Sequence, residues 1–257
     1  MTALQHINAF DLLDDVAPDE ELPGYEAATA PAYSSGLYHE PLMTYSLRQY
    51  DRRIQMLVAY GSATTSSYRI TTNNFRMFSK KPEMEVLYTS PENRQRNIAS
   101  IAFNNNGAIP WRPRAHFDHT DSTGSTSTYN MESANFTDWT VGIRGVTYVW
   151  RVDMSPISIV LSELNSHIVI ARFTYSACGT SAARGAEVGE LTIFRDSLTS
   201  ETDGIGKMVC SLMIALTQLK KMGRYYTNTV NELERSRSLR GEQLELRRTS
   251  TAAFSTV

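Results

Sequence analysis

Cysteine is scarce in this sequence, with two residues in a chain of 257. Small secreted domains that depend on disulfide bonds carry a larger share, so no disulfide framework is expected. Cys210 lies in an apolar run and is predicted to be a buried thiol, whereas Cys178 is predicted to lie on a loop. Residues 1–15 lack the basic start and apolar stretch of a signal peptide. We therefore expect a reducing, cytoplasmic location, with peripheral attachment to a membrane as the other option.

Catalytic sequence motifs are missing as well. The chain has no G-x-S-x-G nucleophile elbow and no P-loop. Gly204-Ile205-Gly206 lacks the third glycine of a dinucleotide-binding fingerprint. These absences predict a protein that is not an enzyme and needs no cofactor. A hydrolase remains a third option, which a pocket holding His, an acid and Ser or Cys would favour.

Positive charge is absent from the first part of the chain. Residues 1–44 contain no Lys or Arg and hold eight of the 27 acidic residues. The rest of the chain therefore carries 25 basic residues against 19 acidic ones. The first segment is also too poor in apolar residues to offset the entropy of ordering it, so residues 1–44 are predicted to be a disordered acidic arm. Because the whole chain is acidic and has no reading motif, nucleic acid is not an expected partner.

The pattern from residue 45 onward is that of short strands. Apolar and polar residues alternate in many segments separated by turn-forming residues. The clearest case is a hairpin over residues 139–152, with Arg144-Gly145 at its turn. Roughly ten such strands predict a mainly β domain over residues 45–223, either a closed antiparallel barrel of about ten to twelve strands or a sandwich.

One late helix is predicted at about residues 204–222. Ser200 and Asp203 have the spacing of a capping box, and Gly223 is a suitable end. The run from Met208 to Leu219 is apolar on nearly every face, which is typical of a helix buried on all sides. At about 12 residues it is shorter than the roughly 20 needed to span a bilayer. Residues 224–257 are predicted to be a basic, partly disordered tail.

Many antiparallel strands followed by one apolar helix is an unusual order. The segments GVTYVWRVD, IVIARFTY, GELTIFRDS and DGIGKMVCSLMIALTQLKK resemble the last strands and the central helix of small fungal members of the tubby-like superfamily. That superfamily includes tubby C-terminal domains, phospholipid scramblases and LURP-one-related proteins. The resemblance covers residues 45 to about 222 and implies a barrel of about twelve strands closed around the helix. The acidic arm and the basic tail depart from the family pattern, and no lipid-binding residue can be transferred by position.

The segment HFDHTD holds residue types that bind zinc, but it is predicted to be a solvated loop. His116, Asp118, His119 and Asp121 fall within six residues. No second pair of ligands is evident elsewhere in the sequence, so no metal is expected. Trp111 and Trp150 are predicted to pack in or near the core rather than to form a ligand platform.

Basic residues near predicted strand ends are candidates for contact with an anionic membrane. On a barrel they could gather on one face and attract anionic phospholipid headgroups, each contributing about 1 kcal/mol. Ordinary surface charge is the simpler explanation. A phospholipid-binding or scramblase-like protein is therefore the alternative function, and its candidate residues are Arg69, Arg76, Lys80, Lys81, Arg94 and Arg96.

The leading interpretation comes from the arm. Leu22-Pro23-Gly24-Tyr25 fits the L/P-P-x-Y pattern that WW domains read, and Pro31 with Tyr33 forms a weaker second copy. Proline presets the polyproline II backbone that docks on an aromatic groove. Such motifs resemble the docking sites of WW-bearing ubiquitin ligases. We therefore expect a non-enzymatic intracellular adaptor that recruits a WW-domain partner. A ubiquitin ligase is one class of protein that could be this partner.

The tail holds a candidate regulatory site. Arg247-Arg248-Thr249-Ser250 matches the pattern read by basophilic kinases, although basic tails with Ser are common. Phosphate on Ser250 would add about −1.5 to −2 charges beside the two arginines.

Overall fold

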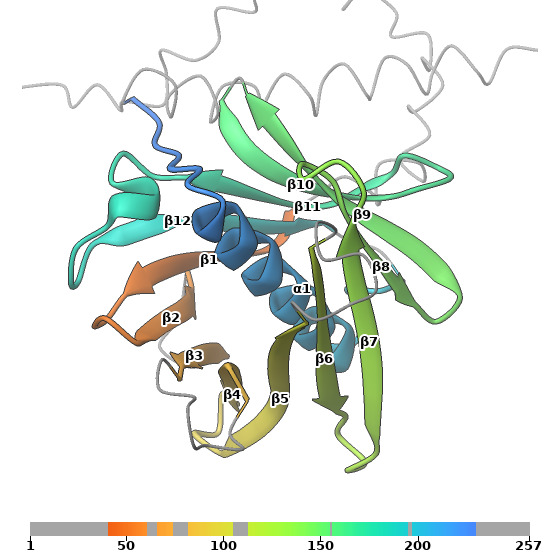
Figure 1. The fold of residues 1–257 in the computed structure, drawn as a ribbon. Helices are drawn as coiled ribbons and strands as arrows, with labels where there is room; N and C mark the ends of the chain where they lie inside the picture. Colours follow the sequence, from red (N-terminus) through yellow and green to blue (C-terminus); the bar gives the residue numbers. More distant parts are fainter. Residues whose placement is uncertain are drawn as a thin grey trace, which may run out of the picture. The chain divides into compact units, whose positions relative to one another are not determined.

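The described residues form a closed antiparallel β-barrel around one α-helix (Figure 1). The computed structural model describes residues 41–60, 66–73, 82–104, 113–154, 156–194 and 197–229. Each strand pairs with its neighbours in the sequence, and the first strand closes the barrel against the last. The strands are β1 (Pro41–Gln49), β2 (Ile54–Ala59), β3 (Ser67–Thr72), β4 (Met84–Thr89), β5 (Gln95–Asn104), β6 (Arg114–Thr120), β7 (Thr126–Ser133), β8 (Trp139–Ile143), β9 (Val146–Met154), β10 (Ile157–Glu163), β11 (Val169–Tyr175) and β12 (Glu187–Phe194). The predicted closed barrel is confirmed, and the sandwich alternative is wrong.

The described residues form twelve strands, within the predicted range of about ten to twelve. β6 lies in a segment that was predicted to be a loop. β1 begins at Pro41, four residues before the predicted start of the barrel. The extra residues of β1 pair with β12, where Pro41 lies opposite Phe194. This pairing joins strands from the two ends of the domain, so no local sequence pattern could reveal it.

The predicted hairpin is confirmed as β8 and β9. Trp139, Val141 and Ile143 are buried, and the polar or small residues between them are not. Arg144 and Gly145 both have positive φ angles, 54° and 79°. Two positive φ angles are what a two-residue hairpin turn requires to match the twist of its strands. The alternation places one row of side chains in the barrel interior.

Helix α1 (Thr202–Lys221) fills the barrel interior, as Figure 1 shows. Every residue from Gly204 to Ala215 is buried, which confirms the prediction that its apolar faces are covered all round. Leu216, also expected to be buried, is only partly covered. The helix ends in a Schellman arrangement, because the Gly223 and Arg224 amides donate to the carbonyls of Lys220 and Leu219. Among the described residues, no helix has the length and apolarity needed to cross a membrane.

Two glycines let α1 begin close to the barrel wall and to the loop before it. A Cβ atom on Gly204 would lie 1.8 Å from the carbonyl oxygen of Leu198. A Cβ atom on Gly206 would lie 2.8 Å from Nε2 of His119 on β6. Neither distance is compatible with a larger side chain in the same place. The glycine pair at 204–206 is therefore explained by packing.

A polar contact inside the core fixes the helix against β9. Nε1 of Trp150 donates to Oγ of Ser211 at 2.9 Å, and Ser211 Oγ donates to the Met208 carbonyl at 2.8 Å. Both side chains are fully buried. The one polar residue in the helix's apolar run thus satisfies a buried indole N–H that would otherwise lack a partner. The prediction that Trp150 packs in the core is confirmed, and Trp111 lies outside the described residues.

The chain remains bound to the barrel after the helix ends. Asn228 is buried, and its side-chain amide donates to the carbonyls of Ile157 and Tyr175, both at 2.8 Å. Its side-chain oxygen accepts the amide of Ile157 at 2.9 Å. Residues 224–229 therefore belong to the packed domain, although the sequence predicted the tail to begin at 224. The remaining tail, residues 230–257, lies outside the described residues.

Candidate functional site

The segment HFDHTD forms most of strand β6 and its end, so the predicted loop is wrong. Residues alternate between the two faces of the strand, which places Phe117 and His119 inside the barrel. His116 and Asp118 lie on the outer face. Side chains on opposite faces of a strand cannot bind one ion, and the described residues contain no group of three potential metal ligands.

His119 is a buried base with unusual surroundings. It is 1% exposed, and neither ring nitrogen has a hydrogen-bond partner in the described structure. Burial, followed by the positive charge of Lys207, lowers its pKa from 6.5 to about 4. Arg96 lowers the pKa further, while Asp203 and Asp121 act in the opposite direction. His119 is therefore neutral at neutral pH and serves as packing against α1.

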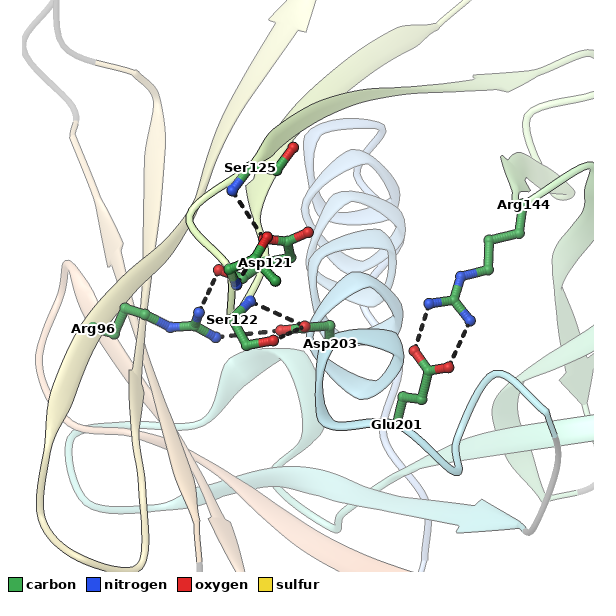
Figure 2. A network of polar contacts seen from close by, with 8 residues as sticks. Arg96, Asp121, Ser122, Ser125, Arg144, Glu201 and Asp203 are labelled. Atoms are coloured by element: carbon green, nitrogen blue, oxygen red, sulfur yellow. Dashed lines mark hydrogen bonds and ion pairs between the residues drawn. The ribbon is translucent and has the colours of Figure 1, made fainter.

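Asp203 anchors the end of the barrel at which α1 begins (Figure 2). Its carboxylate accepts the backbone amide and the hydroxyl of Ser122 at 3.0 and 2.8 Å. Arg96 donates to its other oxygen at 3.3 Å. The predicted capping box is wrong, because Glu201 is the N-cap residue and Ser200 donates to the Ser197 carbonyl instead. Asp203 is thus used to tie the helix to β5 and to the β6–β7 turn.

A second ion pair holds the same end. Arg144, in the β8–β9 turn, donates to both carboxylate oxygens of Glu201, as Figure 2 shows. Hydrogen bonding and the charge of Arg144 lower the pKa of Glu201 below its ordinary value. Arg94, which is exposed near this end, pairs with Glu92 at 3.2 Å. Arg94, Arg96 and Arg144 at this end of the barrel therefore have acidic partners, and the pairs of Arg96 and Arg144 tie the start of α1 to the barrel wall.

The opposite end, where α1 finishes, has a different charge pattern. A pocket of about 970 Å³ opens there between the β1–β2 turn, the loop before β12 and the last turn of α1. Its lining includes four exposed basic side chains, which we call the basic mouth: Arg52, Arg53, Arg184 and Lys220. Within the described residues, none of the four side chains forms an ion pair.

The acid that lines this pocket is engaged with the backbone. Oδ1 of Asp51 accepts the amides of Arg53 and Ile54 at 2.6 and 2.9 Å. These bonds stabilise the tight turn between β1 and β2. The pocket therefore carries an excess of positive charge that the neighbouring described residues do not neutralise. It is the candidate functional site of the barrel.

Three of the six candidates for lipid contact lie in the described residues. Arg94 and Arg96 line one pocket at the end of the barrel where α1 begins, and Arg69 does not line it. Arg69 lies on the outer face of β3, between the buried residues Tyr68 and Ile70. Arg96 is on the inner side, where it contacts Asp203, and Arg94 pairs with Glu92. The other three, Arg76, Lys80 and Lys81, lie outside the described residues. Their segment begins after Asn73 and returns at Pro82, where the Asn73 side chain donates to the Pro82 carbonyl at 2.9 Å.

Sequence reasoning missed the basic mouth. Its arginines come from two short segments, YDRRIQ and AARGAE, that are more than 120 residues apart. The one sequence feature that could have indicated this site was the position of Arg52 and Arg53 in the turn between two strands. Their approach to Arg184 depends on the closure of the barrel, which brings the β1 end beside the loop before β12.

The other predicted sites lie outside the described residues. These are the WW-ligand residues Leu22, Pro23, Tyr25, Pro31 and Tyr33, and the phosphorylation candidate Ser250. Comparisons with protein-family models, with curated proteins and with solved structures found no match to this chain.

Proposed function

We propose that the protein is a non-enzymatic intracellular adaptor in which the barrel is a scaffold and the acidic arm recruits a WW-domain partner. The observation that carries the scaffold role is the filled interior, because α1 is buried from Gly204 to Ala215. Ligands therefore have to bind at the outer wall or at the ends of the barrel. A barrel closed around a hydrophobic helix is also the architecture that the tubby-like resemblance implies.

The arm supplies the recruiting peptide in this proposal. β1 begins at Pro41, which is exposed. Pro23 presets the backbone, and Tyr25 supplies a second anchor with a polar end. A WW-bearing ubiquitin ligase is the class of partner that this motif fits.

Binding of the arm to WW domains tests the proposal. A peptide covering residues 15–35 is expected to bind an L/P-P-x-Y-reading WW domain with modest affinity, because the interface is small and the free peptide flexible. Tyr25→Ala should abolish binding, since it empties the main pocket. Tyr33→Ala serves as the matched control and should have a smaller effect, measured by titration calorimetry. Equal binding by Tyr25→Ala and the parent peptide would contradict the proposal.

Peripheral binding to an anionic phospholipid surface is a second candidate function. The basic mouth favours it, because its four cations lack ion-pair partners in the described structure. Tyr50, on the same β1–β2 turn, is 58% exposed. An exposed aromatic side chain beside basic residues suits the interface between water and lipid headgroups.

Vesicle sedimentation tests this second function. The full chain is expected to pellet with vesicles that contain phosphatidylserine and to remain in solution with neutral phosphatidylcholine vesicles. Binding should weaken as salt is raised, because the attraction is electrostatic and is screened. Equal partitioning to neutral and anionic vesicles, or none to either, would rule out this function.

A further inference from the structure

The basic mouth combines cations from three separate parts of the fold. Arg52 and Arg53 come from the β1–β2 turn, Arg184 from the loop before β12, and Lys220 from the last turn of α1. They line one pocket, which also includes the hydroxyl-bearing residues Thr72 and Thr217. Cations held on separate elements around a recess can surround a ligand, whereas cations on one strand can meet it from one side only.

The two ends of the barrel differ in how their charges are used. At the end where α1 begins, Arg96 and Arg144 are each paired with a carboxylate. At the basic mouth, no carboxylate pairs with any of the four cations in the described part of the chain. Like charges that share a pocket repel one another, so this arrangement costs stability unless an anion is bound.

Of the four cations in the basic mouth, only Lys220 has a role in stabilising the described part of the fold. Lys220 lies in the last helical turn, where a positive charge offsets the negative end of the helix dipole. Lys221 in the same turn pairs with Glu83 at 3.4 Å. The three arginines have no such role, because their guanidinium groups contact no described acid. A bound anion would give their shared position a role.

The chemistry of arginine indicates the class of ligand. A guanidinium group presents parallel N–H donors that match two oxygens of a phosphate, and such charge-assisted bonds are strong. A phosphate monoester has three terminal oxygens and carries about −1.5 to −2 charges at pH 7. A phosphodiester has fewer free oxygens and a single charge. Three arginines and one lysine thus suit the monoester better than the diester.

We propose that the basic mouth is a binding site for a phosphate monoester group, carried by a lipid headgroup or by a small soluble molecule. This proposal deepens the second candidate function by naming the group that the mouth recognises, but a soluble monoester would satisfy it without a membrane. Phosphatidic acid and glycerol 3-phosphate are the lipid and soluble forms of the same group. They serve as the two probes.

The first experiment tests the lipid form of the ligand. It compares phosphatidic acid with phosphatidylglycerol, a diester, in vesicles adjusted to equal surface potential. The full chain is expected to bind phosphatidic acid vesicles more tightly. Arg52→Gln combined with Arg184→Gln should weaken this binding by about tenfold, equivalent to about 1.4 kcal/mol. Arg52 and Arg184 are exposed, so the melting temperature of this variant should not fall below that of the parent protein.

The matched control is Arg69→Gln combined with Arg94→Gln, which removes the same charge away from the mouth. This control should retain the preference for phosphatidic acid. Equal loss in both double variants would show that only overall charge matters and would overturn the proposal. Equal binding of phosphatidic acid and phosphatidylglycerol by the parent protein would also overturn it, while leaving the general lipid function intact.

A second experiment, with a soluble ligand, distinguishes a lipid from a small molecule as the source of the phosphate monoester. Glycerol 3-phosphate is expected to shift amide resonances of the β1–β2 turn and of the loop before β12, and the Arg52→Gln, Arg184→Gln variant should lose these shifts. Shifts from glycerol 3-phosphate without vesicle binding would support a soluble ligand and refute the lipid function. Absence of shifts together with no preference between the vesicles would refute the monoester site.

Discussion

Leu212→Asp is expected to unfold the domain. Leu212 is fully buried in the middle of α1, inside the closed barrel. An uncompensated charge at such a site and the lost apolar packing together should cost more than about 4 kcal/mol. That is a large part of the roughly 5–15 kcal/mol by which domains are stable. Loss of the cooperative thermal transition, followed by circular dichroism, is the measurement.

Leu164→Asp provides the matched control for this substitution. Leu164 is 37% exposed, at the end of β10, so the same chemical change meets water there. Its effect should stay within about 0.5 kcal/mol. If Leu212→Asp melts at the same temperature as Leu164→Asp, α1 does not fill the barrel core in solution.

Acidification from pH 7.5 to pH 5 is expected to destabilise the protein through His119. Its pKa is about 4 in the folded state and 6.5 ordinarily, so the unfolded chain binds the proton more readily. The stability that neutral His119 provides is fully present above pH 6.5 and is lost as the pH falls towards 4. The full loss is about 3 kcal/mol, since one unit of pKa difference corresponds to about 1.4 kcal/mol.

The variant His119→Leu should flatten this dependence. The quantity to measure is the slope of unfolding free energy against pH in urea denaturation, which does not depend on the absolute stability of the variant. Phe117→Leu, which changes a buried side chain of the same strand but removes no titratable group, should keep the parent slope. A parent protein and a His119→Leu variant with the same slope would show that His119 is not the responsible group.

The ion pairs of Asp203 and Glu201 are lost at lower pH, because the pKa values of both carboxyls are lowered from 3.8 and 4.5.

The helix and the class of fold could be predicted from the sequence because their signals are local. A run such as Met208–Leu219, apolar on nearly every face, has to be covered on nearly every face, and the other predicted elements of the domain are strands. That strands enclose the helix in a closed barrel is what the tubby-like resemblance implied. Alternation in Trp139, Val141 and Ile143 marks one buried row for the same reason. These patterns express burial of adjacent residues and therefore remain visible in a single chain.

Strand β6 was misread because its polar residues hide its period. His119 and Asp121 looked like part of a solvated loop, yet His119 occupies an inward position of the strand. A histidine in the interior is tolerated here because Gly206 leaves room for its ring and the ring stays neutral. The fit between these two residues depends on β6 meeting α1, and no pattern within HFDHTD contains that information.

The sequence by itself determined that the chain builds a β domain around a buried helix, that it has an acidic arm, and that the arm carries an L-P-x-Y motif. The tertiary structure alone decided which basic side chains form ion pairs and which have no acidic partner among the described residues. The position of α1 inside the barrel places Asp203 beside Arg96, and closure of the barrel places Arg52 in one pocket with Arg184 and Lys220. Electrostatic energy depends on distance in space, and residues far apart along the chain become neighbours only when the first strand pairs with the last.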